Sequence, residues 1–227
     1  MTVIFLLRHA HSEANGAGIL AGQMPGVHLS KVGKREAKNF AKNYRYVKFD
    51  QIYVSPLERC SETISPYLAE SSKKRRFTKP IIENLNFVEM DYGAWSGLKL
   101  QKLALKPLWR KIQNNPITVT FPEGESFRSL NLRIKKGLLE IARLHKNKNI
   151  LVVTHGDVIK IATAIALNMD FNDFQKIAID PASITAISII GKKFRVLTVN
   201  SRAEPVAVDG QRFALGGGAG SKAKRRK

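Results

Sequence analysis

Apolar and polar positions along the chain form short continuous apolar runs separated by longer segments with helical spacing. The run at residues 3–7 is uninterrupted, contains β-branched side chains and stops at Arg8. This pattern predicts a buried parallel strand that ends in a polar loop. The other predicted strands are residues 49–54 and 150–153, followed by an antiparallel pair at 184–190 and 194–199.

Helical spacing of apolar residues predicts helices between these strands. The predicted helices span residues 31–44, 57–70, 126–144 and 158–167. Ser30 is the candidate N-cap of the first, and Pro66 is expected to kink the second or end it early. Strands that alternate with helices predict an α/β fold with helices on both faces of the sheet.

Three segments break this alternation. Glycines and a proline between residues 16 and 26 predict a loop. Residues 81–126 are irregular and contain both tryptophans, so we interpret them as an insertion over the sheet edge. The apolar signal fades near residue 200, which predicts one domain over residues 1–200 and a flexible, basic, glycine-rich tail over residues 201–227.

The chain has 227 residues and a formal net charge of +20. Such a charge favours an anionic partner, which could be nucleic acid, a membrane surface or a small molecule. The charge is scattered along the sequence, which favours solvated surface positions over a nucleic-acid interface. Cys60 is the single cysteine, so no intrachain disulfide can form. No signal peptide or membrane span is evident, and a cytoplasmic protein without membrane contact is expected.

Two histidines occupy equivalent places in two strand units. His9 follows the first predicted strand, and His155 follows the third. Ligands of open α/β sheets bind beyond the carboxyl ends of strands, so both imidazoles are expected to face one crevice. Arg8 precedes His9, and Arg59 lies just after the second strand. Two guanidinium groups and several helix N-termini suit a dianionic phosphate. Because such residues follow three predicted strands, the sequence predicts a phosphate site at the carboxyl ends of the sheet.

Five sequence blocks strengthen this interpretation. Residues 7–15, Leu-Arg-His-Ala-His-Ser-Glu-Ala-Asn, resemble the Arg-His-Gly signature of the histidine phosphatase superfamily, in its phosphoglycerate-mutase-like branch (branch 1). Residues 55–63, 89–97, 122–126 and 154–157 resemble the later blocks, in family order. The resemblance covers roughly residues 2–200. Within the branch, residues 107–109, 180–183 and 216–220 are most similar to actinobacterial members.

The resemblance implies a three-layer α/β/α sandwich with a mostly parallel, doubly wound sheet and an insertion over the active site. It implies that His9 is the nucleophile that becomes phosphorylated, and that Glu89 is the general acid for the leaving oxygen. The residues that would surround the phosphoryl group or bind the substrate are Arg8, Asn15, Arg59, His155 and Gly156. No cofactor is expected, and the absence of an HExxH or clustered-carboxylate pattern argues against a metal enzyme.

The chain departs from the family pattern at three positions. Ala10 replaces the usual glycine after the nucleophile, which could shift the loop unless φ stays negative. Ala21 stands where mutases often carry a hydroxyl group that contacts phosphate. His11 stands where many members have Glu or Gln, and we interpret it as a structural histidine, with a substrate contact as the alternative.

Three functions remain open. The first is hydrolysis of a phosphomonoester of a small phosphorylated metabolite, and the second is mutase-type transfer of the phosphoryl group to another hydroxyl. Ala21 and the short insertion favour hydrolysis. The third is a catalytically retired fold that acts as a binding module, although every expected catalytic group is present. We expect no nucleic-acid or membrane partner, and a homodimer stays an open alternative.

Overall fold

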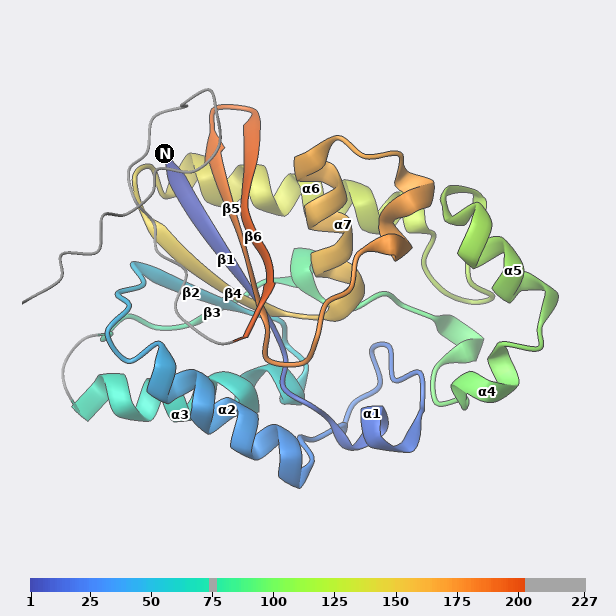
Figure 1. The fold of residues 1–227 in the computed structure, drawn as a ribbon, viewed down its shortest axis with the longest axis horizontal. Helices are drawn as coiled ribbons and strands as arrows, with labels where there is room; N and C mark the ends of the chain where they lie inside the picture. Colours follow the sequence, from blue (N-terminus) through green and yellow to red (C-terminus); the bar gives the residue numbers. More distant parts are fainter. Residues whose placement is uncertain (74–76, 203–227) are drawn as a thin grey trace, which may run out of the picture.

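The computed structural model describes residues 1–73 and 77–202, and within them one sheet is covered by helices on both faces (Figure 1). The strands are β1 (Thr2–Arg8), β2 (Gln51–Val54), β3 (Ile82–Glu83), β4 (Asn149–Thr154), β5 (Ile184–Ile190) and β6 (Lys193–Ser201). The α-helices are α1 (Glu13–Ala17), α2 (Lys31–Asn43), α3 (Glu58–Lys73), α4 (Leu100–Leu103), α5 (Pro107–Asn114), α6 (Phe127–Leu144) and α7 (Gly156–Leu167). The 3-10 helices are η1 (Leu85–Phe87), η2 (Gly93–Trp95), η3 (Pro116–Thr118) and η4 (Phe171–Lys176). Of the predicted tail, residues 203–227 lie outside the described part of the chain.

The strand order is β3-β2-β4-β1-β5-β6. Neighbours among β3, β2, β4 and β1 are parallel, whereas β5 pairs antiparallel with both β1 and β6. The predicted α/β fold with a mostly parallel sheet is confirmed, and so is the antiparallel pair near the end of the domain.

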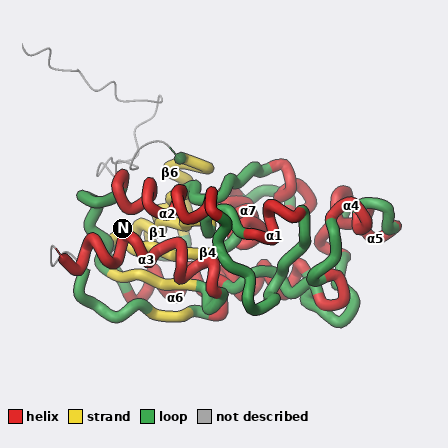
Figure 2. The backbone as a smooth tube through the Cα atoms, turned by 90° about the horizontal axis from the view of Figure 1, so that it is seen from below, coloured by secondary structure: helices red, strands yellow, loops and turns green. Residues whose placement is uncertain are grey.

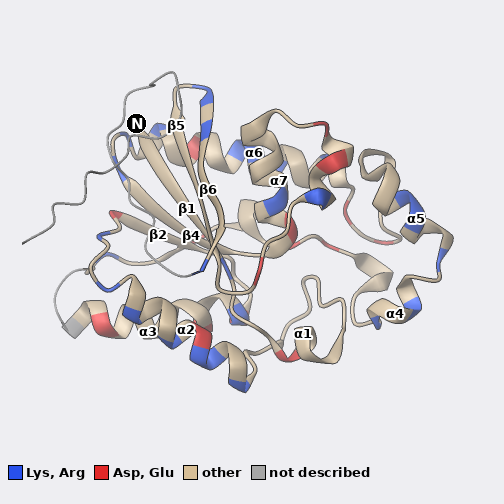
Figure 3. Ribbon diagram, in the orientation of Figure 1, with Lys and Arg blue, Asp and Glu red and all other residues tan. Residues whose placement is uncertain are grey.

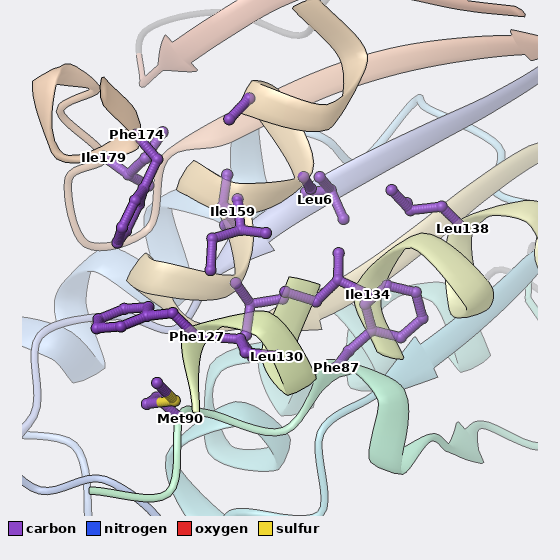
Figure 4. Packing of buried hydrophobic residues seen from close by; sticks show 14 of the residues in the cluster. Leu6, Phe87, Met90, Phe127, Leu130, Ile134, Leu138, Ile159, Phe174 and Ile179 are labelled. Atoms are coloured by element: carbon purple, nitrogen blue, oxygen red, sulfur yellow. The ribbon is translucent and has the colours of Figure 1, made fainter. Parts of the chain in front are cut away.

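The side chains of β1 divide the core into two layers, because successive residues of a strand point to opposite faces. Ile4 and Leu6 pack in the cluster that includes α6 and α7, whereas Phe5 and Leu7 pack in the cluster that includes α2 and α3. Figure 2 shows the backbone of the sheet and its helices from below, and Figure 4 shows Leu6 among the apolar side chains of α6 and α7. A strand buried on both faces explains the uninterrupted apolar run.

Strand register brings the expected site residues together. Arg8 of β1 pairs with Thr154 of β4, and the His9 backbone N–H donates to the Thr154 carbonyl oxygen at 2.8 Å. The first residues after β1 and β4, His9 and His155, are therefore neighbours. The Ser55 N–H after β2 donates to the Val153 carbonyl oxygen at 2.9 Å, which places a third strand end beside them.

The helix predicted at residues 57–70 does not end at Pro66. Helix α3 continues to Lys73 with the proline inside it. Proline removes one backbone hydrogen bond and crowds the preceding turn. Ile64 and Tyr67, on either side of it, are buried in the core below the sheet. Tertiary packing of this apolar face therefore outweighs the local preference of proline.

The insertion is more ordered than its sequence indicated. It begins with β3, which pairs with β2 at the sheet edge, and continues through η1, η2, α4, α5 and η3. Helices α4 and α5 lie beyond the carboxyl ends of the parallel strands (Figure 1). The predicted glycine-rich loop also contains helix α1, which Ser12 and Asn15 cap reciprocally at its N-terminus.

Candidate active site

A cavity of about 590 Å³ lies at the carboxyl ends of the parallel strands. Part of its lining is a cluster of ionisable groups, and part is apolar and comes from loops and from α5. The ionisable residues that sequence analysis singled out and that line this cavity are Arg8, His9, Arg59 and Glu89. The cavity therefore combines a charged site with room for an organic group beside it.

His9 is 4 % exposed, and its ring is oriented by its own backbone neighbour. Its Nδ1 lies 2.8 Å from the Ala10 carbonyl oxygen, and because a carbonyl only accepts, Nδ1 carries the proton. Burial, the Arg59 charge and the Arg8 charge hold the pKa of His9 well below its ordinary value. The ring is therefore neutral at pH 7, and Nε2 keeps its lone pair.

The two arginines are anchored, yet each retains an unsatisfied nitrogen. Arg8 Nη1 donates to the Ile179 carbonyl oxygen at 2.6 Å, and Arg59 Nη2 donates to the Gly22 carbonyl oxygen at 2.7 Å. Arg8 Nε and Arg59 Nη1 are buried and have no hydrogen-bond partner among the described residues. Buried cationic donors without a partner are unfavourable, and an anion bound in the cavity would satisfy them.

His155 is placed differently from the expectation that both imidazoles face the crevice. It is fully buried and is not among the residues that line the cavity. Its ring centroid lies 5.3 Å from that of His9, and its Nε2 lies 2.6 Å from the Ser55 hydroxyl. Burial and the Arg59 charge hold its pKa well below the ordinary value. The register of β4 sets His155 beside His9, and the surrounding side chains cover it, so only His9 faces the cavity.

Glu89 has the properties that an acid near neutral pH requires. Burial, with a smaller contribution from the Asp157 charge, raises the pKa of Glu89 to about 7. The Met90 backbone N–H donates to Glu89 Oε1 at 3.0 Å. Near pH 7 the carboxyl group is therefore divided between its protonated and ionised forms. The expected aromatic neighbours Phe87, Tyr92 and Trp95 are all buried.

Asn15 and Gly156 also line the cavity. Asn15 Oδ1 accepts hydrogen bonds from the Ser12 backbone N–H and hydroxyl, both at 3.0 Å, which leaves its amide Nδ2 for a ligand. Gly156 is the first residue of α7, and a Cβ there would lie 3.4 Å from Arg8 Cζ. The Arg8 guanidinium group therefore lies directly against the N-terminus of this helix.

Sequence and structure comparisons show the family and the fold. The model of the Histidine phosphatase superfamily (branch 1) matches residues 4–202. The chain belongs to this superfamily. Phosphoserine phosphatase 1 of Hydrogenobacter thermophilus is 30% identical over 202 residues, which cover 88% of this chain and 92% of that protein. The adenosylcobalamin/alpha-ribazole phosphatase of Escherichia coli is 28% identical, with 88% and 96% covered.

The fold is shared with solved structures of other proteins. The crystal structure of the alpha-ribazole phosphatase from Shigella flexneri superposes with a TM-score of 0.78 at 24% identity, covering 91% of this chain and all of that chain (100%). The comparisons confirm the predicted superfamily, the phosphoglycerate-mutase-like α/β fold and the prediction of an enzyme of the phosphatase type.

The structure accommodates the three residues that depart from the family pattern, Ala10, His11 and Ala21, without backbone strain at these positions. Ala10 has a negative φ, so its methyl group causes no backbone strain. His11 Nδ1 lies 2.9 Å from the Ser30 hydroxyl, and its backbone N–H donates to Glu36 at 2.8 Å, which supports a structural role. Ala21 lines the cavity and presents a methyl group where a hydroxyl was expected in mutases.

Sequence analysis missed the wall of the cavity that α5 provides. Trp109, Ile112 and Gln113 all line the cavity from this helix. Trp109 also stacks on Trp95, with ring centroids 6.4 Å apart. Spacing of three and four residues places these side chains on one helix face. That spacing could have indicated the helix. It was hard to detect because the helix has only eight residues and lies within an irregular segment.

A second group that was not foreseen surrounds Asp157. The Tyr92 hydroxyl donates to Asp157 Oδ2 at 2.8 Å, and Lys160 Nζ lies 3.4 Å from Asp157 Oδ1. All three residues line the cavity. This group fixes a negative charge near Glu89, which contributes to the raised pKa of that carboxyl group.

Over residues 1–73 and 77–202, no three His, Cys, Asp or Glu side chains come together as metal ligands. Helices that could cross a membrane are also lacking in this part of the chain. Figure 3 shows Lys and Arg spread over the helices on both sides of the sheet and over α4 and α5. This distribution agrees with the solvated-surface interpretation of the net charge.

Proposed function

We propose that this protein hydrolyses phosphate monoesters of small metabolites through a phosphohistidine at His9. The observation that carries the proposal is the pairing of a neutral, oriented His9 with two unsatisfied arginine nitrogens in the same cavity. Phosphoryl transfer requires mainly alignment and hydrogen-bond donors around the phosphoryl oxygens. Arg8 Nε and Arg59 Nη1 are such donors.

In the first step, His9 Nε2 forms a bond to phosphorus while the bond between phosphorus and the ester oxygen breaks. The departing oxygen takes the proton of Glu89, because an alkoxide is too basic to leave unaided. Arg8 and Arg59 stabilise the negative charge of the transferring group. His155 acts on the phosphoryl group from its buried place beside the His9 ring, whereas the amide of Asn15 and the backbone of Gly156 line the phosphate site itself.

In the second step, a water molecule attacks the phosphorus of the phosphohistidine. Glu89, ionised by the first step, accepts a proton from this water, and the phosphorus–nitrogen bond breaks. Inorganic phosphate and neutral His9 result, so the enzyme returns to its initial state. One carboxyl group with a pKa near 7 serves both steps, since it is readily protonated and readily ionised at neutral pH.

The substrate class follows from the cavity and the relatives together. Relatives of this chain are named for phosphoserine and alpha-ribazole phosphates, which are both phosphate monoesters of small molecules. A cavity of about 590 Å³ has room for such a group beside the phosphate site. Ala21 offers no hydroxyl to retain a phosphorylated intermediate, which favours hydrolysis over the mutase alternative.

We further propose that the enzyme is cytoplasmic. The single cysteine, Cys60, is buried and forms no disulfide, which is compatible with a reducing compartment. The segments at residues 107–109 and 180–183 support a grouping with actinobacterial members of the branch. A homodimer stays an alternative to the monomer, and size-exclusion chromatography with light scattering distinguishes them.

The test is a panel of phosphorylated metabolites offered to the purified protein, with release of inorganic phosphate as the measurement. His9→Ala is the control. Hydrolysis predicts phosphate release that is independent of any bisphosphate primer. Transfer of the phosphoryl group to another hydroxyl, dependent on a primer, would instead establish the mutase, and equal rates for wild type and His9→Ala would reject both.

A further inference from the structure

The side chain of Arg133, on α6, forms hydrogen bonds to Glu125 and to the backbone near Glu89. Its Nε donates to Glu125 Oε1 at 2.8 Å, and its Nη2 donates to Glu125 Oε2 at 2.9 Å. The pair is a two-point fork, and both side chains are largely shielded from solvent, at 18% and 13% exposure. Such a fork fixes the plane of the guanidinium group.

The remaining guanidinium hydrogens point at the segment that carries Glu89. Arg133 Nη1 donates to the carbonyl oxygens of Val88 at 2.7 Å and Asn86 at 3.0 Å. Its Nη2 donates to the carbonyl oxygen of Glu89 itself at 3.0 Å. With the fork to Glu125, these bonds satisfy all five N–H groups of the side chain.

The same segment is held from two other directions. Thr154, which precedes His155, donates its hydroxyl to the Phe87 carbonyl oxygen at 2.6 Å. The Gln23 side chain donates to the Glu89 carbonyl oxygen at 2.8 Å. The backbone carbonyl groups from residue 86 to residue 89 are therefore all bound by side chains. Arg133 supplies three of these five hydrogen bonds, and it links the segment to α6.

Helix α6 is suited to this close approach. Gly137 lies four residues after Arg133, on the same side of the helix. A Cβ at Gly137 would lie 2.8 Å from Asn86 Cβ and 2.9 Å from Phe87 Cζ, so only glycine lets α6 lie this close to η1. Arg133 and Gly137 together hold the helix against the segment that precedes Glu89.

We propose that Arg133 is a positioning residue for the acid step, which holds the backbone at Glu89 so that its carboxyl group faces the leaving oxygen. The inference rests on the proposed function, in which Glu89 is the acid. Without Arg133 the carbonyl groups of Asn86 and Val88 lose the partners described above, and that of Glu89 keeps only the Gln23 side chain, so the segment is free to move the carboxyl group away from the cavity. Nucleophilic attack by His9 does not depend on this contact.

The test compares two substrates that differ in their need for an acid. Glycerol phosphate has an alkoxide leaving group that must be protonated, whereas 4-nitrophenyl phosphate has a phenolate that leaves without help. Arg133→Met should lower kcat/KM for glycerol phosphate by roughly 10- to 100-fold, part of the contribution of a general acid, and change that for 4-nitrophenyl phosphate less than about threefold. Arg133→Lys keeps the charge but not the fork, and should give an intermediate loss.

The matched control is Lys136→Met, which removes an exposed cation from the same helix. This substitution should leave kcat/KM unchanged for both substrates. If Arg133→Met does not fold, Arg133→Lys and Glu125→Gln provide the test, because Glu125→Gln loosens the fork while it keeps the arginine. Thermal unfolding of each variant establishes that the compared proteins are folded.

The pH profile gives a second measurement that general destabilisation does not change. Glu89 is surrounded by Asp157, Arg59 and Arg8, which act on its charge. In wild type, hydrolysis of glycerol phosphate should decline as pH rises through about 7, where Glu89 loses its proton. If Arg133 substitution lets Glu89 reach water, its pKa falls, and the decline should occur at lower pH.

Each outcome decides the proposal. A selective loss for glycerol phosphate with a shifted pH profile supports it. Equal loss for both substrates in a folded variant, or no loss for either, overturns it. Failure of the proposed function is recognised separately, because His9→Ala would then be as active as wild type on both substrates.

Discussion

The Nδ1–H group of His9 donates a hydrogen bond to the carbonyl oxygen of Ala10, its neighbour along the chain, at 2.8 Å. This contact selects one tautomer of a neutral ring and leaves Nε2 as the reactive atom. Orientation by a backbone carbonyl does not depend on which residue follows the histidine. The substitution of Ala10 for the usual glycine therefore leaves the nucleophile unchanged.

His9→Ala should abolish turnover. Loss of a covalent nucleophile lowers kcat on the order of a millionfold in the best-studied enzymes, and we expect a rate at or below detection. Intact mass spectrometry of wild type during turnover, quenched without acid because phosphohistidine is acid-labile, should show one added phosphoryl group. An unchanged rate in His9→Ala would contradict the mechanism, and His11→Ala, with its structural contact to Ser30, serves as the comparison.

Glu89→Gln should affect substrates according to their leaving groups. For an alkyl phosphate we expect kcat/KM, which reports only the steps up to formation of the phosphohistidine, to fall by about 100- to 10,000-fold, the range of general acid catalysis, and for an activated aryl phosphate kcat/KM should fall little. Wild-type hydrolysis of the alkyl ester should fall as pH rises through about 7, since the acid must be protonated and its pKa is raised to about 7. Glu89→Gln should lack this decline. Equal losses for both esters would assign the acid role elsewhere, with Glu13 the next residue to test.

Turnover should require no divalent metal ion. In the proposed mechanism, Arg8 and Arg59 supply the positive charge that a metal supplies in other phosphatases. Dialysis against a chelator should leave kcat and KM for the best substrate unchanged. A rate that collapses on chelation and returns with added magnesium would contradict the proposed phosphate site.

Trp109→Ala should distinguish substrates by the size of their leaving groups. Trp109 lines the cavity from α5, and a lost apolar contact of this kind is worth about 1 to 3 kcal/mol. We expect KM for naphthyl phosphate to rise on the order of tenfold, with little change for glycerol phosphate. Lys111→Ala, an exposed position on the same helix, is the control. A uniform loss for both esters would mean that α5 supports the fold and does not contact the substrate.

The elements that position the phosphate site could be predicted because strand ends are marked locally. The apolar run of β1 stops at Arg8, and that of β4 stops before His155, so the two histidines could be aligned from sequence alone. Their different exposure could not be predicted. It depends on the Ser55 hydroxyl beside His155 and on the side chains that cover it, and these contacts arise only in the folded sheet.

The elements that were missed depend on contacts between distant residues. Helix α5 begins at Pro107 and ends before Pro116, and its eight residues are too few for the apolar spacing to repeat. Arg133 resembles any arginine on an amphipathic helix, and its role becomes visible only when η1 packs beside it. Helix α1 was within reach of sequence analysis, because Ser12 and Asn15 have capping-box spacing and Gly18 ends the helix with a φ of 63°.

The position of β4 between β1 and β2 has a consequence for synthesis on the ribosome. Strands β1 and β2 are synthesised before β4, yet they do not pair with each other, and each pairs with β4 instead. Until residues 149–154 leave the exit tunnel, these apolar strands have unpaired edges, which makes the nascent chain vulnerable to aggregation. The arrival of β4 both protects those edges and delivers His155 to His9, so a truncated chain that stops before it would lack solubility and catalysis together.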